Sequence, residues 1–328
     1  MSYLPPNTPY VNTVFVSPSG RAESPGSDVA SPTTYQRAIA EVQDDTLIWL
    51  GPGTYSDGDG QGTQTTTIQA NNVTLQSITP GAPSLSVQQT NTLVPSLGFS
   101  SNPFASIEDQ VVINGRRDIR FVGLRFSGDI SEQGSPGPIF FSNCSGSGVI
   151  ARTNPSGNMS IVSCAFGGRN YVTSGSGGGS LTITGGGSAA FGEVLVENPG
   201  HSTQVFNVSR VGKITYTQPG PAILAQLSNI LDDDRPIDAP GTFLSLVAVT
   251  CGDTQFGLPR PLTGGDYLFQ GVTYDEPNST LGSPAAFARS FFSQLAYVPE
   301  DLADWSGNDP RLVSEAINRI ARQIGPIA

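Results

Sequence analysis

The sequence predicts an all-β protein that folds as a right-handed single-stranded parallel β-helix of about ten coils, each a short solenoid repeat. The first observation is the composition. Charged residues make up only 13%, whereas glycine (39) and proline (26) are frequent, and 37% of the chain is hydrophobic. A polar, turn-rich chain that still contains many β-branched and aromatic residues is typical of proteins with many short strands. The second observation is an internal repeat.

The repeat is ten residues long and occurs in four clear copies, at residues 71–80, 117–126, 157–166 and 265–274. Each copy has Asn or Asp at position two, apolar residues at positions three, five and eight, and a small residue at position seven. Apolar residues two apart lie on one face of a strand, and the small residue allows a tight corner. Because no Asn-Gly or Asp-Gly turn separates the two halves, we expect a strand, a corner and a second strand of one coil rather than a hairpin.

The spacing of the copies supports a solenoid. The third-position residues are Val73, Ile119, Met159 and Tyr267, and Leu244 belongs to a looser fifth copy. With coils of about 20–23 residues, the intervals between them predict two, two, four and one turns along the chain. Further strands are expected at residues 181–183, 194–196 and 213–216.

The sequence divides into three regions. Residues 1–55 read as an N-terminal cap and first coil, with a strand at 14–16, a helix opened by Ser31-Pro32 and a buried strand at 46–50. We expect Tyr35, Ala38, Ile39 and Val42 to form the apolar stripe of this helix. We expect residues 56–279 to form the β-helix and residues 280–328 to form a helical tail.

The tail predicts an assembly contact. A helix starting at Asp309-Pro310 has a single apolar stripe, which consists of Val313, Ala316, Ile317, Ile320 and Ile324. A helix of this kind needs to cover the end of the solenoid or to pack against another chain. We therefore expect a homo-oligomer, with a trimer favoured.

The net charge excludes some classes of partner, and the cysteine count excludes a disulfide framework. A net charge of -11 argues against nucleic acid and against anionic membrane surfaces. No apolar stretch is long enough to span a bilayer, and the first residues do not resemble a signal peptide, so we expect export by assembly or lysis. Cys144, Cys164 and Cys251 cannot build a disulfide framework and are expected to be small core residues. No cofactor is expected.

Residues 14–20, 35–39 and 47–55 together resemble the N-terminal cap and first coil of the pectin lyase-like superfamily. This resemblance, which extends over roughly residues 11–276, implies a right-handed parallel β-helix. The superfamily includes lyases, hydrolases, esterases, phage tailspikes and non-enzymatic surface proteins. Residues 304–321 are similar to short helical tails on structural proteins of large DNA viruses, which implies a virion capsid or spike component.

The motifs of β-helix enzymes are missing from the sequence. Galacturonan hydrolases of this fold carry Asn-Thr-Asp, Gly-Asp-Asp, Gly-His-Gly and Arg-Ile-Lys, and none of these occurs. We therefore predict no catalytic, cofactor or metal site and expect a non-enzymatic virion structural protein. Two alternatives stay open: a tailspike-like polysaccharide lyase or glycosidase whose carboxylates come from separate coils, and a glycan-binding adhesin.

Three sequence features are candidate binding sites. The only basic cluster is a candidate glycan contact, with a surface ladder against carboxylates as the simpler interpretation, and it comprises Arg116, Arg117, Arg120 and Arg125. The acidic loops at Asp57 and Asp59 and at residues 232–234 could ligate calcium, but we interpret both as solvated loops. The single histidine, His201, is expected in a turn.

Overall fold

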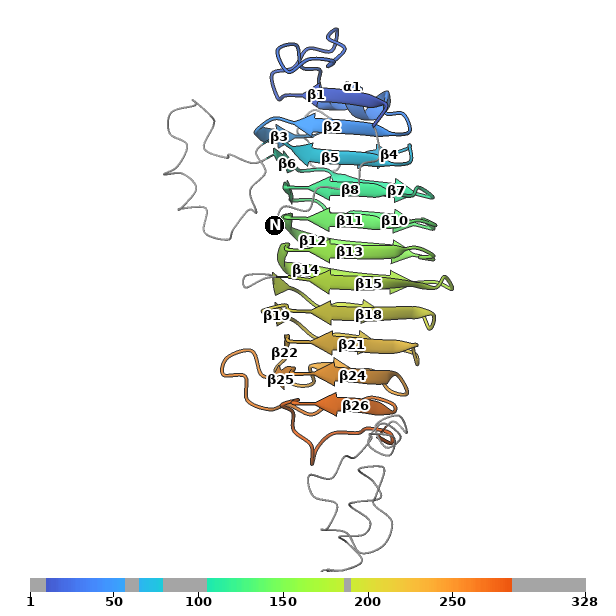
Figure 1. Ribbon diagram of the computed structural model, residues 1–328, viewed down its shortest axis with the longest axis vertical. Coiled ribbons are helices and arrows are strands. Elements are labelled where there is room, and N and C mark those ends of the chain that lie inside the picture. Colours follow the sequence, from blue (N-terminus) through green and yellow to red (C-terminus); the bar gives the residue numbers. More distant parts are fainter. Residues whose placement is uncertain (1–9, 57–64, 79–104, 186–189, 285–328) are drawn as a thin grey trace, which may run out of the picture.

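The computed structural model describes residues 10–56, 65–78, 105–185 and 190–284, which form a parallel β-solenoid of about eight turns (Figure 1). The all-β class is confirmed, and the parallel coiling is consistent with the expected right-handed β-helix. The number of coils is slightly lower than the expected ten. Strands stack along the long axis of the molecule, from β1 at one end to β26 at the other.

Two parallel sheets line the solenoid. The first sheet, here called sheet A, has eleven strands in this order: β1 (Asn12–Val16), β2 (Thr46–Leu50), β5 (Val73–Ser77), β8 (Ile119–Val122), β11 (Ile139–Ser142), β13 (Asn158–Val162), β15 (Gly179–Thr184), β18 (His201–Phe206), β21 (Ala222–Gln226), β24 (Phe243–Val247) and β26 (Tyr267–Gln270).

The second sheet, sheet C, contributes two strand segments to most coils and has fifteen strands. In chain order these are β3 (Gly53–Tyr55), β4 (Thr65–Ile68), β6 (Ala105–Ile107), β7 (Gln110–Asn114), β9 (Leu124–Phe126), β10 (Ile130–Gln133), β12 (Ser145–Thr153), β14 (Ala165–Ser174), β16 (Ala190–Phe191), β17 (Val194–Val196), β19 (Arg210–Val211), β20 (Ile214–Tyr216), β22 (Asn229–Leu231), β23 (Ile237–Asp238) and β25 (Thr250–Gly252).

The strand register confirms the repeat and corrects one interval. The steps from Ile119 to Met159, from Met159 to Leu244 and from Leu244 to Tyr267 take two, four and one turns, as predicted. The step from Val73 to Ile119 was predicted as two turns but is one, because β5 pairs directly with β8. This coil is longer than the others since residues 79–104, which lie outside the described residues, are inserted in it.

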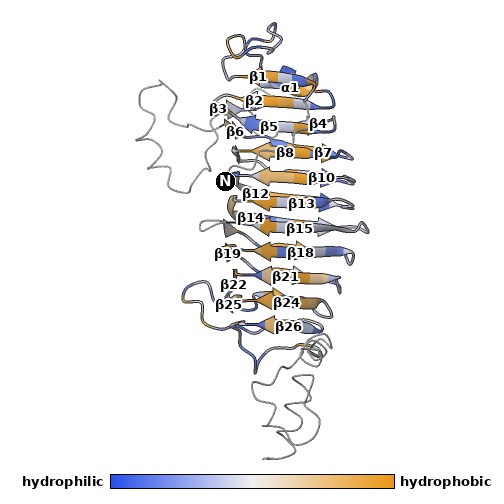
Figure 2. Cartoon of the chain, viewed as in Figure 1, coloured by the Kyte–Doolittle hydropathy of each residue, from blue (hydrophilic) through white to orange (hydrophobic). Residues whose placement is uncertain are grey.

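The core runs along the inside of the coils as stacks of like residues. In the copies that begin at residues 117, 157 and 265, positions three, five, eight and ten pack into the core, whereas Ile78, at position eight of the first copy, is exposed. Apolar residues gather in the strands while the turns are polar (Figure 2). Phe121 stacks on Phe141 with ring centroids 4.9 Å apart, and Phe141 meets Phe166 edge-to-face at 5.9 Å. Stacked aromatic rings thus form part of one continuous core that extends along the solenoid.

The corner at position seven is a left-handed turn in most coils. Its φ is positive in Gly123, Asn143, Ser163, Asn207, Leu227, Ala248 and Gly271. The Asn or Asp at position two suits a turn or the same left-handed conformation. Asn72 (φ 51°) and Asp118 (φ 58°) are left-handed. Asp266 lies in the bend before β26 without a positive φ, and Asn158 is the first residue of β13.

Replacing Leu227 with glycine is expected to stabilise the protein by about 1 kcal/mol, because a left-handed backbone costs a side-chain-bearing residue roughly that much. Leu227 has φ 50° and is 60% exposed, so little packing is lost with the side chain. Leu195→Gly, in the extended backbone of β17, is the control and is expected to destabilise. Chemical denaturation measures both changes, and an equal loss of stability in the two variants would contradict the argument.

The buried thiols brace this corner. The Cys144 amide donates to Cys164 Sγ at 3.3 Å, and that thiol donates to the Val162 carbonyl at 3.3 Å. Ser228 makes the same two contacts, with the Val208 amide (3.1 Å) and the Gln226 carbonyl (2.8 Å). The expected core role of the cysteines is confirmed, since all three are buried and free.

Because Ser228 makes the same contacts as Cys164, the outcome of two substitutions of Cys164 can be predicted. Cys164→Ser is expected to keep the corner intact, whereas Cys164→Ala leaves the buried Cys144 amide without an acceptor and costs about 1–3 kcal/mol more. Thermal denaturation of the two variants side by side gives the difference. If serine destabilises as much as alanine, the thiol acts through its volume alone.

The N-terminal cap differs in detail from the prediction. Helix α1 (Tyr35–Ala40) is capped by Thr34, whose side chain accepts a hydrogen bond from the Arg37 amide, and not by Ser31. Tyr35, Ala38 and Ile39 are buried as expected, while Val42 lies beyond the helix end and is partly buried. The predicted tail, with Val313, Ala316, Ile317, Ile320 and Ile324, lies outside the described residues. Among the described residues no helix is long and apolar enough to cross a membrane.

Candidate functional site

The four arginines of the basic cluster lie on different parts of the solenoid. Arg116 and Arg117 occupy the turn between β7 and β8. The pKa of the Asp44 carboxyl group is lowered mainly by hydrogen bonds from Asn71, and the positive charges of the two arginines lower it further. Arg120 points outward from sheet A, and Arg125 is exposed on β9 of sheet C. The structure therefore does not bring all four together on one surface, and the glycan contact stays a prediction for each arginine separately.

The acidic loop at residues 232–234 is held by its own backbone. Asp232 Oδ1 accepts hydrogen bonds from the amides of Asp234 (3.0 Å) and Arg235 (2.9 Å). Asp233 accepts from the amide and the hydroxyl of Thr254, which lowers the pKa of its carboxyl group. The described residues contain no group of three or more potential metal ligands. Asp57 and Asp59 lie outside the described residues.

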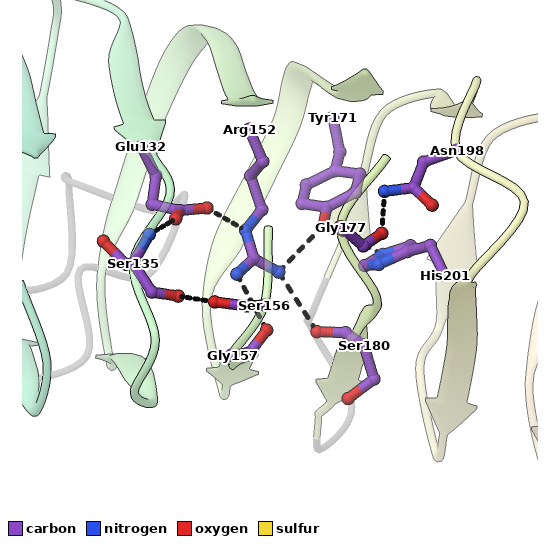
Figure 3. Close-up of polar contacts among 10 residues, drawn as sticks. All are labelled: Glu132, Ser135, Arg152, Ser156, Gly157, Tyr171, Gly177, Ser180, Asn198 and His201. Carbon is purple, nitrogen blue, oxygen red and sulfur yellow. Dashed lines mark hydrogen bonds and ion pairs between the residues drawn. The ribbon is translucent and has the colours of Figure 1, made fainter. Parts of the chain in front are cut away.

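Four buried titratable side chains lie together inside the described part of the solenoid. Glu132 on β10, Arg152 on β12, Tyr171 on β14 and His201 on β18 line up along the axis, one coil after the next (Figure 3). All four are fully buried. We call these four residues the polar ladder. Sequence reasoning had placed His201 in a turn, but it is the first residue of β18 and faces the interior.

An ion pair forms the first rung of the polar ladder. Arg152 Nε lies 2.6 Å from Glu132 Oε2, and Glu132 Oε1 accepts from the Ser135 amide at 2.6 Å. The remaining guanidinium nitrogens donate to the carbonyls of Gly157 (2.9 Å) and Ser180 (3.3 Å). Burial lowers the pKa of Arg152, but Tyr171 and Glu132 outweigh it and the net shift is upward. The cation is thus bonded on every side, as a buried charge requires.

The second rung fixes the protonation of His201. The Tyr171 hydroxyl accepts a hydrogen bond from Arg152 at 3.3 Å and lies 3.0 Å from His201 Nε2. Because the arginine is always a donor, we infer that the hydroxyl proton points to an unprotonated Nε2. Burial raises the pKa of Tyr171 to about 12, and burial together with Arg152 lowers the pKa of His201 to about 3. Tyrosine and histidine are therefore both neutral at physiological pH.

Three buried polar atoms near the polar ladder have no partner among the described residues: Ser135 Oγ, Thr173 Oγ1 and His201 Nδ1. The neutral tautomer inferred above puts the histidine proton on Nδ1, which is an unpaired donor. Buried polar atoms of this kind are normally satisfied by enclosed water. The ladder can tie coils together, but its complete burial keeps it from contact with a substrate outside.

Part of the polar ladder could have been predicted from a pattern in the sequence. Glu132 and Arg152 each follow an inward isoleucine by two positions, and they stand one coil length apart. Two charged residues at inward-facing strand positions, one coil length apart, are predicted to meet inside the solenoid. Tyr171 gives no such signal, because aromatic residues occur at many inward positions.

The outer face of sheet A carries a shallow notch of about 300 Å³. Its outward-facing lining includes Arg120, Phe140, Val162 and Thr182 from four neighbouring strands. The Arg120 guanidinium lies 5.7 Å from the ring centroid of Phe140 and donates to Asn72 Oδ1 at 3.0 Å. The notch is thus apolar with one cation at its edge.

Comparisons with known proteins add little to this description. No protein-family model and no curated protein matches the chain. One solved structure, titled "Crystal structure of pectate lyase Pel9A", is similar at 13% identity and a TM-score of 0.44, covering 91% of this chain and 90% of that chain. The activity in that title belongs to that protein. The strand register itself establishes what this chain is, a parallel β-helix scaffold.

Proposed function

We propose that this protein is a non-enzymatic structural component of a virion, either a minor capsid, decoration or spike protein, in which the β-helix serves as a rigid scaffold. One observation carries the proposal. The acid, base and cation that lie together in the described residues are fully buried inside the solenoid, where Arg152 and Tyr171 connect Glu132 to His201 across neighbouring coils.

The arrangement of the polar ladder supports a structural role over catalysis. A general acid or base needs to reach the proton it transfers, within hydrogen-bond distance of the substrate. The carboxylate of Glu132 is paired with Arg152 and accepts a hydrogen bond from the Ser135 amide. The hydroxyl of Tyr171 is hydrogen-bonded to Arg152 and His201. The bonds from Arg152 to Glu132 and Tyr171, and from Tyr171 to His201, connect neighbouring coils, which is what a scaffold requires.

The virion setting rests on the resemblance of residues 304–321 to helical tails of viral structural proteins. Under this proposal the partners are other virion proteins and further copies of the chain, without nucleic acid or membrane insertion. Purified particles, analysed by mass spectrometry after density-gradient separation, test this point. We expect the protein to band with the particles, and its absence from washed particles would contradict the setting.

A cleavage screen tests the absence of enzymatic activity. The full-length protein is incubated with acidic polysaccharides, and product formation is followed by ultraviolet absorbance for lyases and by reducing ends for hydrolases. We expect no turnover. Turnover that a single Asp→Asn substitution on the outer surface abolishes would overturn the proposal and favour the tailspike-like enzyme. Binding without turnover would favour the glycan-binding adhesin.

A further inference from the structure

The outer face of sheet A is almost free of charge. Arg120 is the only Lys, Arg, Asp or Glu in its eleven strands, although the chain has a net charge of -11. The strands of sheet C carry outward-facing charges at Arg125, Arg210 and Asp238, whereas their Glu132 and Arg152 face the interior. The outer face of sheet A is thus poorer in charge than that of sheet C.

The same face is rich in large apolar side chains. They point away from the core and are half-buried by their neighbours, and they comprise Phe15, Leu47, Trp49, Val122, Phe140, Val162, Phe206, Leu224, Val247 and Leu268. Depletion of charge together with aromatic enrichment is typical of the centre of a protein interface.

We propose that this face is covered by a second copy of the same chain. Tyr10 already covers Thr74, an outward residue of β5, with its hydroxyl 2.6 Å from Thr74 Oγ1. The open part of the face therefore extends from β8 to β26, and eight strands at about 4.8 Å spacing and roughly 15 Å of strand length give a flat area of roughly 600 Å². Specific interfaces bury about 600–1,000 Å² on each partner, so the face reaches the lower end of that range. Two molecules of charge -11 repel each other over most of their surface, and sheet A is the face on which that repulsion is weakest.

The shape of this face is self-complementary, because it carries both a notch and large side chains that could fill the notch of a second copy. The notch lies over β8, β11, β13 and β15, and the large side chains Phe206 and Leu224 stand on the next two strands, β18 and β21. A twofold axis that runs parallel to the strands, in the plane between the two faces and above β15, would place Phe206 and Leu224 of each copy over the notch of the other. Contacts of this kind are reciprocal, as in any twofold dimer. Thr182 and Thr184, the outward residues of β15, would lie near the axis.

Sedimentation velocity on the full chain tests the interface. Phe206→Glu and Val162→Glu place a charge on the two complementary parts of the face, and both are expected to weaken self-association by at least about tenfold. The matched control, Leu195→Glu, puts the same charge on the outer face of sheet C and is expected to change nothing. All three positions point outward, and far-UV circular dichroism checks that the fold is kept.

Two results would overturn the proposal. The first is a wild-type protein that stays monomeric at the highest soluble concentration, as expected if a glycan or another part of the chain covers the face. The second is an oligomer that Phe206→Glu and Val162→Glu leave unchanged, which would assign assembly to another surface such as the tail. Either result leaves the non-enzymatic scaffold standing.

A cross-linking experiment tests the position of the axis without relying on stability. Thr182→Cys is treated with a bis-maleimide that spans about 10 Å, the spacing of two packed sheets. We expect a covalent dimer with Thr182→Cys and none with Ala151→Cys on the outer face of sheet C. The three native cysteines are buried and serve as an internal background. Equal dimer yields from the two variants would contradict the proposed packing.

Discussion

Substituting Glu132 with glutamine is expected to lower the free energy of unfolding by about 3–5 kcal/mol, the usual cost of leaving one member of a buried ion pair without its counter-charge. Glutamine keeps the shape of the side chain and removes only the charge, so Arg152 remains buried as an uncompensated cation. The midpoint of urea denaturation, followed by circular dichroism at pH 7, measures the loss.

The double variant Glu132→Leu with Arg152→Met is the control for this experiment. It removes both charges together and is expected to be far closer to wild type than either single substitution, since apolar replacements of buried ion pairs are often neutral. If Glu132→Gln costs less than about 1 kcal/mol, the guanidinium reaches solvent or another acceptor and the ladder does not hold the coils.

Acidification is expected to destabilise the protein through His201. The unfolded chain takes up a proton near pH 6.5, whereas the folded protein resists protonation until about pH 3. The unfolded state therefore binds more protons in this window. The stability that comes from keeping the histidine neutral is complete above pH 6.5 and is lost progressively as the pH falls toward 3. At about 1.4 kcal/mol per pKa unit, the loss amounts to several kcal/mol.

His201→Gln separates this effect from general acid denaturation. A glutamine amide can still reach the Tyr171 hydroxyl but does not titrate, so the variant is expected to show a flatter dependence of stability on pH between 6.5 and 3. Denaturation midpoints at a series of pH values give the two curves. Parallel curves for wild type and variant would show that His201 does not control the acid sensitivity.

The fold could be predicted from the sequence because its information is local and repeated. Apolar residues at positions three and five of each copy predict inward faces, and the register confirms them from Ile119 to Leu246. The interval from Val73 to Ile119 was misread because a sequence distance cannot distinguish two regular coils from one coil with an insertion. The cap at Thr34 was missed because Ser31 and Thr34 both satisfy the sequence preference for a helix N-cap.

The site was harder to predict than the fold. Contacts between coils depend on which residues of each strand face inward. His201 was assigned to a turn because Pro199-Gly200 precedes it. The arginines at 116, 117, 120 and 125 are neighbours in sequence but are separated by a corner, which sends Arg125 onto a different sheet from Arg120. Proximity along a solenoid chain therefore predicts little about proximity on its surface.

The polar ladder also bears on how the molecule opens. Each coil pairs only with the coils before and after it, so local unfolding begins at either end and advances coil by coil. Glu132, Arg152, Tyr171 and His201 lock several coils in the middle of this array. Backbone amides near β12 and β14 are therefore expected to exchange hydrogen with solvent more slowly than those near β2 or β24, and the last segment to lose its structure would be the one that contains its buried charges.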